Sequence, residues 1–112
     1  MSSFDKDRFV ELITNEDVIS QSCQIFDALK DPTRFLIMSH LALGEKSVSE
    51  LVEEVGVSQS AMSHQLRLLR DRSLVKSVRK GRNILYSLDD EHVVNLLRVG
   101  LEHASERFDE RG

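Results

Sequence analysis

Apolar residues recur at three- and four-residue steps over much of the chain, and this period predicts helices. A short amphipathic piece lies within residues 1–14, and a longer helix runs from about Glu16 to Lys30. Asp31-Pro32, an N-cap followed by proline at the first helical position, opens a third helix that reaches Leu43 before Gly44 ends it. The residues of this third helix expected to face inward are Phe35, Ile37, Met38, Leu41 and Ala42.

Two short helices joined by a glycine turn come next. Ser47 and Glu50 form a capping-box pattern at the start of the first, which runs from Val48 to Val55. Ser58 is a second N-cap, and the helix after it runs from Gln59 to about Arg72. The buried positions of that helix are expected to be Met62, Leu66 and Leu69. Two short helices in this arrangement predict a helix-turn-helix.

After Ser73 the pattern changes to the alternation that is typical of strands. Residues 74–79 and 84–88 predict two short strands, joined by the loop Lys80-Gly81-Arg82-Asn83. The fold class is therefore mainly α with a small β-hairpin, which is a winged helix-turn-helix. We expect one domain over residues 1–112, with the helix-turn-helix at about 48–72, the wing at about 74–88 and a final helix at about 89–107.

The net charge of −4 is unevenly spread over the 112 residues. Residues 67–82 hold seven basic side chains and one acid, whereas residues 89–112 hold seven acids and three bases. A basic helix and a basic hairpin tip suit the phosphates and base edges of DNA. The side chains that we expect to contact DNA are Gln59, Ser60, Ser63, His64, Arg67 and Arg70 on the helix and Arg79, Lys80 and Arg82 on the hairpin.

Nothing in the sequence predicts a membrane span or a signal peptide, because no apolar run approaches about eighteen residues and the first residues lack a basic start. We therefore expect a cytoplasmic protein with no membrane partner. The single cysteine, Cys23, excludes a disulfide within the chain and fits a small buried apolar position. His40 fits a packing or surface position better than a metal site, because no second ligand lies one turn away.

The final helix carries potential metal ligands on one face. His92 and His103 are eleven residues apart, which at 100° per residue returns to within about 20° of the same direction, and Glu106 lies one turn beyond His103. Along the axis eleven residues rise roughly 16 Å, whereas two atoms bound to one zinc ion lie at most about 4 Å apart. One helix cannot close such a site, but an antiparallel second copy would place His92 opposite His103 and Glu106.

Asp90 can join this site only from the first turn of the helix. Inside a regular helix it would point about 200° away from His92, so its backbone must leave helical geometry. An N-cap at Asp89 or Asp90 would allow this. Two imidazoles and two carboxylates form a closed tetrahedral set that suits Zn²⁺, with Co²⁺ or Cd²⁺ as surrogates. A homodimer would hold two such sites, each shared between protomers, and a closed set indicates a regulatory ion.

The sequence also contains Asp31-Pro32-Thr33-Arg34, the run from Ser58 to Leu66 followed by Leu69, then Leu74-Val75, and Gly81-Arg82 with Tyr86 and Leu88. Together these motifs resemble the ArsR/SmtB family of metal-responsive bacterial repressors over about residues 16–107. The resemblance implies a homodimer formed by the first and last helices. It also implies a winged helix-turn-helix that binds an imperfect inverted repeat in operator DNA, and release of the DNA when metal binds.

The zinc-sensing subtype of that family has an Asp, a His two residues on, a second His eleven further on, and an acid or a His three after that. Asp90, His92, His103 and Glu106 match all four positions. Relatives that bind metals through thiolates use a cysteine pair where this chain has Ser47 and Ser49. Nickel sensors add ligands from the termini, and no histidine lies near either end of this chain.

The resemblance implies a zinc-responsive repressor of metal efflux or homeostasis genes. It also implies a relay, in which the histidine matching His103 bonds the backbone carbonyl at the position of Ser73. Other interpretations stay open: the same fold could respond to redox through Cys23 or to a different metal. A zinc hydrolase would need an open coordination position, and a purely structural dimer leaves the basic hairpin unexplained.

Overall fold

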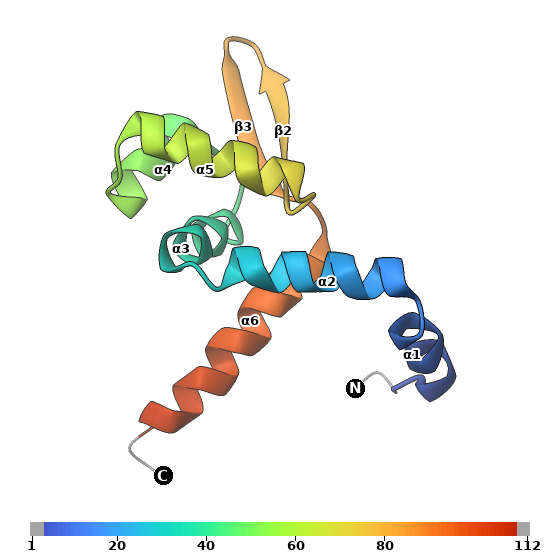
Figure 1. Ribbon diagram of the computed structural model, residues 1–112. Helices are drawn as coiled ribbons and strands as arrows, with labels where there is room; N and C mark the ends of the chain where they lie inside the picture. The colour runs from blue at the N-terminus through green and yellow to red at the C-terminus, as the bar shows by residue number, and fades with distance from the viewer. Residues whose placement is uncertain (1–3, 110–112) are drawn as a thin grey trace.

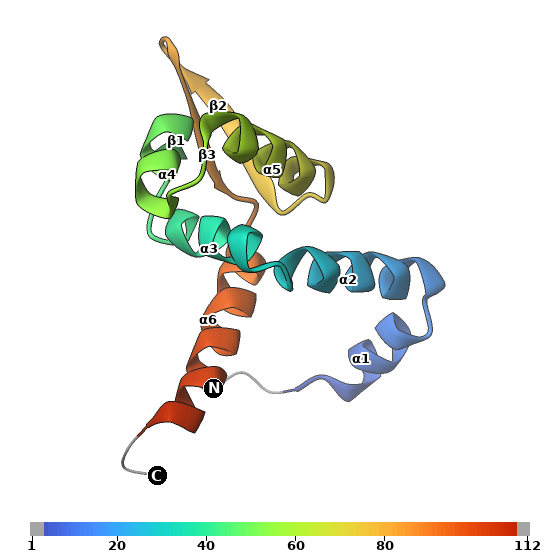
Figure 2. The same ribbon diagram turned by 60° about the vertical axis from the view of Figure 1, so that its left-hand side comes forward.

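The computed structural model describes residues 4–109, which form a mainly helical molecule with a small sheet (Figures 1 and 2). The helices are α1 (Lys6–Ile13), α2 (Glu16–Leu29), α3 (Pro32–Leu41), α4 (Val48–Val55), α5 (Gln59–Asp71) and α6 (Glu91–Ser105), and α6 continues into the 3-10 turn η1 (Glu106–Phe108). The strands are β1 (Lys46–Ser47), β2 (Val75–Lys80) and β3 (Asn83–Leu88). Within the described part of the chain, no helix has the length and apolar character needed to cross a bilayer.

The core lies where α3, α4, α5, the sheet and the start of α6 meet. The largest fully buried side chains are Ile37, Met38, Leu51, Met62, Leu66, Leu69, Leu74 and Leu97. They confirm the predicted apolar stripe of α5, and each buried Leu, Ile or Met contributes about 1.5–3 kcal/mol of transfer free energy. Helix α2 buries only Ala28 and Leu29 at its C-terminal end, and Figure 1 shows the rest of it projecting from the core.

The helix-turn-helix is fixed by the local signals predicted for it. The Ser47 hydroxyl accepts a hydrogen bond from the Glu50 N–H at 3.2 Å, and the Glu50 carboxylate accepts one from the Ser47 N–H at 2.8 Å, which confirms the capping box. Helix α4 ends at Gly56, whose φ of 88° is left-handed. The Ser58 hydroxyl then caps α5 by accepting from the Ala61 N–H at 3.1 Å.

The end of α5 is a Schellman motif built on a serine. The Ser73 N–H donates to the Arg70 carbonyl at 3.0 Å, and the Leu74 N–H donates to the Leu69 carbonyl at 3.0 Å. Leu69 and Leu74 are both buried, so the motif also has its usual apolar contact. Ser73 has a φ of 60°, a left-handed conformation that glycine adopts more easily.

The sheet has the strand order β1-β3-β2, and both pairs are antiparallel. The wing runs in register from Val75↔Leu88 to Lys80↔Asn83, so the predicted four-residue loop shortens to Gly81-Arg82, with Gly81 at a φ of 64°. Strand β1 was not predicted, because two residues are too few to show alternation. It pairs with the middle of β3 and ties the start of α4 to the wing.

Four sequence predictions are wrong in detail. Helix α3 ends at Leu41 rather than Leu43, and Ala42, expected to face inward, is exposed beyond the last helical turn. Cys23, expected to be buried, is exposed, because only the last turn of α2 packs into the core. The final helix is shorter than residues 89–107, since Asp90 is its N-cap and Glu106 begins the 3-10 turn.

Candidate metal centre and nucleic-acid interface

Asp90 caps α6 in a way that leaves half of its carboxylate for another partner. Its backbone is extended, with φ −159° and ψ −178°, so the side chain turns back over the first turn. One oxygen, Oδ1, accepts from the N–H groups of His92 at 2.9 Å and Val93 at 3.3 Å. The other, Oδ2, lies 3.5 Å from Nδ1 of His92. The structure thus brings Asp90 and His92 together through the N-cap geometry that the sequence required.

The surroundings of Asp90 favour its ionised form. Partial removal from water acts to raise the pKa of its carboxyl, but the hydrogen bonds from the Val93 N–H and from His92 outweigh this effect. The pKa of Asp90 therefore lies below its ordinary value of 3.8. A carboxylate that is ionised at neutral pH is the form that a metal ion binds.

His103 and Glu106 form a second pair at the other end of α6. The Nδ1 atom of His103 lies 3.8 Å from Oε1 of Glu106, and their side chains are 85% and 75% exposed. His92 is also almost fully exposed, at 93%. Among residues 4–109 no group of three or more His, Cys, Asp or Glu side chains lies close enough to hold a metal ion. The chain therefore presents two separate, exposed two-residue pairs at the two ends of one helix.

The residues predicted to contact DNA lie on α5 and on the wing. The structure places the side chains of Gln59, Ser60, Ser63, His64, Arg67, Arg70, Arg79, Lys80 and Arg82 on the surface. Figures 1 and 2 show the wing extending beyond α5, so both elements are accessible from outside the core. Lys80 already has a partner, because its Nζ lies 2.8 Å from Oε1 of Glu45, just before β1.

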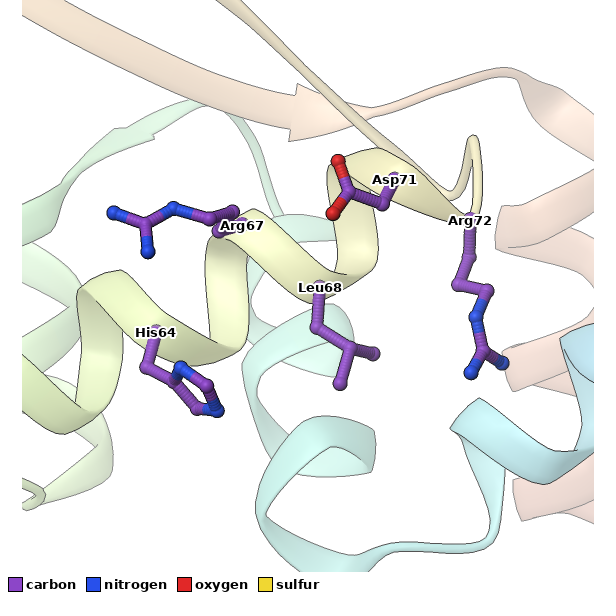
Figure 3. A pocket seen from close by; sticks show the side chains of 5 residues that line it. All are labelled: His64, Arg67, Leu68, Asp71 and Arg72. Atoms are coloured by element: carbon purple, nitrogen blue, oxygen red, sulfur yellow. The ribbon is translucent and has the colours of Figure 1, made fainter.

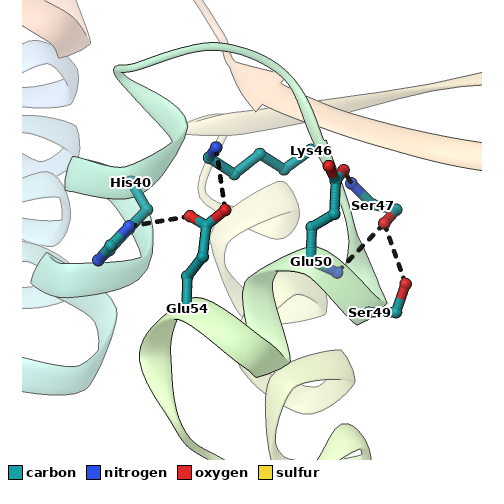
Figure 4. A network of polar contacts seen from close by, with 6 residues as sticks. All are labelled: His40, Lys46, Ser47, Ser49, Glu50 and Glu54. Carbon is teal, nitrogen blue, oxygen red and sulfur yellow. Dashed lines mark hydrogen bonds and ion pairs between the residues drawn. The ribbon is translucent and has the colours of Figure 1, made fainter.

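His40 belongs to a polar cluster between α3, β1 and α4 (Figure 4). Its Nδ1 lies 3.0 Å from Oε1 of Glu54, and the other carboxylate oxygen of Glu54 lies 3.2 Å from Nζ of Lys46. These half-buried contacts agree with the expected packing role of His40. The hydroxyls of Ser47 and Ser49 lie 3.2 Å apart in the same region.

Two side chains relevant to the interface could not be found from the sequence. Glu45 holds Lys80, and Arg72 reaches from the end of α5 to α2 instead of pointing outward with the other bases of residues 67–82. Both contacts join residues that lie 35 and 48 positions apart in the chain. Only the tertiary fold brings such distant residues together, so neither contact leaves a periodic signal.

Residues 31–77 match the family described as bacterial regulatory protein, arsR family. The transcriptional repressor SmtB homolog of Synechocystis sp. (strain ATCC 27184 / PCC 6803 / Kazusa) is 49% identical over 90 residues, which cover 80% of this chain and 68% of that protein. This chain belongs to the ArsR/SmtB family. The family match runs from the N-cap of α3 into β2, so it covers the DNA-binding core of this ArsR/SmtB protein and leaves α6 outside.

Two further comparisons concern the regulator NmtR of Mycobacterium tuberculosis (strain ATCC 25618 / H37Rv). NmtR is 44% identical to this ArsR/SmtB chain over 85 residues, which cover 76% of this chain and 71% of NmtR. The solution structure of apo-NmtR superimposes with a TM-score of 0.69 at 36% identity, covering 95% of this chain and 81% of that one. These relatives and the winged helix-turn-helix identify the ArsR/SmtB protein as a transcriptional regulator and not an enzyme.

Proposed function

We propose that this ArsR/SmtB protein is a metal-responsive repressor that binds operator DNA in the cytoplasm and releases it when zinc binds. The regulated genes would serve metal efflux or homeostasis. The observation that supports zinc is the presence of two exposed pairs, Asp90 with His92 and His103 with Glu106, at opposite ends of α6. Each pair provides one imidazole and one carboxylate, which is half of a tetrahedral set.

The proposed unit is a homodimer, because α2 and α6 leave a large apolar surface uncovered. A groove between them is lined by Phe26, His92, Asn95, Leu96, Val99 and Gly100. Phe26 and Val99 are more than half exposed in the single chain. A second copy of the chain would bury this surface, and since His92 lies in the groove, the same contact would bring the ligand pairs of two chains together.

The residues present fit a zinc ion shared between protomers. Asp90 and His92 of one chain and His103 and Glu106 of the other would hold it, giving two ions per dimer, and Co²⁺ or Cd²⁺ would serve as surrogates. When bound, the ion supplies a rigid connection between the α6 helices. Asp90 can take part without uncapping α6, because the Oδ2 atom is not the one that accepts the backbone N–H groups.

The connection would act on DNA through the spacing of the two α5 helices. A dimer reads an imperfect inverted repeat when its recognition helices lie about 34 Å apart, one turn of DNA. A change in the angle between protomers alters that distance and weakens operator binding. By linkage, DNA must weaken zinc binding by the same factor. In our proposal the imidazole of His103 donates a hydrogen bond to the backbone carbonyl of Ser73, at the end of α5, and so connects the metal site to the recognition helix.

The test is a zinc titration of the protein on an operator fragment selected from random DNA. We expect zinc to release the wild-type protein, whereas His103→Ala and Asp90→Asn should bind the fragment and ignore zinc. Asparagine still caps a helix, so Asp90→Asn removes the ligand and keeps the fold. His40→Ala, which removes a histidine outside the site, is the matched control and should respond normally. A normal response from His103→Ala would refute the site assignment.

The same assay separates the second candidate signal. Cys23 is exposed on α2, so an oxidant could reach its thiol in the free chain. Release of the wild-type protein by an oxidant but not by zinc, with loss of that release in Cys23→Ser, would support a redox sensor in place of a zinc sensor. Metal analysis of the purified protein provides an independent check on which ion it carries.

A further inference from the structure

Two arginine side chains connect helix α2, which lines the proposed dimer interface, to the recognition helix α5. Nη1 of Arg72, the C-cap residue of α5, donates to the backbone carbonyl of Gln24 at 3.1 Å. The same nitrogen lies 4.0 Å from Oδ2 of Asp27. Arg72 therefore contacts α2 at two points, one of them a backbone atom that moves with the whole helix.

A second arginine makes a parallel contact near the middle of α5. Nε of Arg34, on α3, donates to the carbonyl of Ala28 at 3.1 Å, and its Nη1 donates to Oε1 of Gln65 at 3.5 Å. Ala28 lies one helical turn after Gln24, so both carbonyls face the same side of α2. The orientation of α5 relative to α2 is thus defined by polar contacts at two points along α5.

The direction of Arg72 separates it from the side chains proposed to bind DNA. Figure 3 shows its guanidinium directed toward α2, while Arg67 and Asp71 on the same helix point to the other side. The side chain of Arg72 is only 30% exposed, unlike that of the exposed Arg70 two positions earlier. A phosphate contact is the usual role of an arginine on a recognition helix, and this geometry argues against it here.

The position of Arg72 makes its contacts sensitive to the dimer. Asp27 lies next to Phe26, which lines the apolar groove of the proposed interface, and Arg72 lies next to Ser73, the left-handed residue that ends α5. A shift of α2 within the interface would move the Gln24 carbonyl and Asp27 together. The guanidinium donates a hydrogen bond to the first and lies 4.0 Å from the second, so it would carry that shift to the last turn of α5.

We propose that Arg72 is a positioning residue that couples the dimer interface to the orientation of the recognition helix. The inference rests on the proposed zinc response and adds a side-chain connection from α2 to the backbone connection at Ser73. Arg72→Lys is the diagnostic change, because lysine keeps the charge but presents a point donor on a flexible stem in place of a planar fork. The variant keeps the same net charge, so its general attraction to DNA is unchanged, but it loses the simultaneous contacts with Gln24 and Asp27 of α2.

The experiment measures operator affinity with a chelator present and with saturating zinc, for the wild type and Arg72→Lys. The ratio of the two affinities is the coupling factor, which is roughly 5- to 150-fold in typical allosteric proteins. We expect Arg72→Lys to reduce this factor by about 3- to 10-fold. The affinity of the free dimer for zinc and the melting temperature should stay close to the wild-type values, which a merely structural role would not predict.

Arg70→Lys is the matched control, because it makes the same chemical change on the exposed side of α5. It should alter DNA affinity equally with and without zinc and leave the coupling factor intact. If Arg72→Lys does not fold, Asp27→Asn weakens the same connection from the α2 side and should lower the coupling factor by a smaller amount. An unchanged coupling factor in the folded variant refutes the inference alone, whereas a wild-type protein that ignores zinc refutes the proposed function and the inference with it.

Discussion

The ion pair between Lys80 and Glu45 predicts that one acid restrains the wing. Lys80 is the last residue of β2, and its Nζ lies 2.8 Å from Oε1 of Glu45. For Lys80 to bind a DNA phosphate, it must leave the carboxylate of Glu45, which also repels the DNA. We therefore expect Glu45→Gln to strengthen DNA binding.

The size of the effect follows from the exposure of the pair. The side chains of Lys80 and Glu45 are 57% and 43% exposed, so water screens their attraction and the pair contributes about 0.2–1 kcal/mol. Losing a competitor of that strength raises the affinity by about 1.4- to 5-fold per wing. For a dimer with both wings on DNA, the two factors multiply to about 2- to 25-fold.

Fluorescence anisotropy on a random-sequence duplex measures this change without an operator. Glu11→Gln is the matched control, because it removes the same charge from α1, which Figure 1 shows far from the wing. The Glu11 carboxylate pairs with Arg8 of the same helix. We expect a gain for Glu45→Gln well above that of Glu11→Gln, and a smaller difference between the two at high salt. Equal gains in both variants, or weaker binding by Glu45→Gln, would show that the pair does not restrain the wing.

Three further predictions address the interface and its support. Arg82→Ala should weaken binding to any duplex and reduce its salt dependence, whereas Gln59→Ala should mainly change sequence preference, and filter binding on operator and random DNA distinguishes the two. Ser73→Gly should raise the free energy of unfolding in urea by about 0.5–1 kcal/mol, because glycine adopts the left-handed φ without a Cβ clash. The Ser47 N–H that donates to Glu50 holds the pKa of that carboxyl below its ordinary value of 4.5. The ionised Glu50 carboxylate therefore stabilises the fold above pH 4.5, and this contribution is lost as the pH falls through the lower folded-state pKa. The unfolding free energies of the wild type and Glu50→Gln should therefore converge in acid.

Local signals in the sequence were sufficient to predict helices α2 to α6 and the two strands of the wing. Several features depend only on residues that lie within one or two helical turns of each other in the sequence. They are the capping box at Ser47, the N-cap at Ser58 and the apolar stripe of α5. The same holds for the start of α6, where the sequence offered Asp89 or Asp90 as the N-cap and the structure has Asp90. Such short-range rules need no knowledge of the tertiary structure.

Predictions that depended on tertiary contacts were less successful. The exposure of Cys23 could not be read from its apolar neighbours, because some of those neighbours on α2, such as Ile19 and Phe26, are themselves exposed. Strand β1 exists because β3 is placed beside it, and the roles of Glu45 and Arg72 depend on partners far along the chain. Arg72 illustrates the difference: the sequence shows its charge among the basic residues of 67–82, but only the fold shows that the side chain points toward α2.

The two ends of α6 differ in how firmly they are held, and this difference gives the proposed sensor its mechanical basis. The first half is buried through Val93 and Leu97, and the N–H of Asp89 donates to the carbonyl of Leu74 at 3.0 Å, next to Ser73. The second half, with His103 and Glu106, is exposed. In the proposed dimer each site joins the anchored pair of one chain to the projecting pair of the other. Binding a metal would therefore fix the projecting end of the partner's α6 next to the end of the recognition helix. If each site instead joined the projecting ends of both α6 helices, metal binding would not need to move either DNA-binding core.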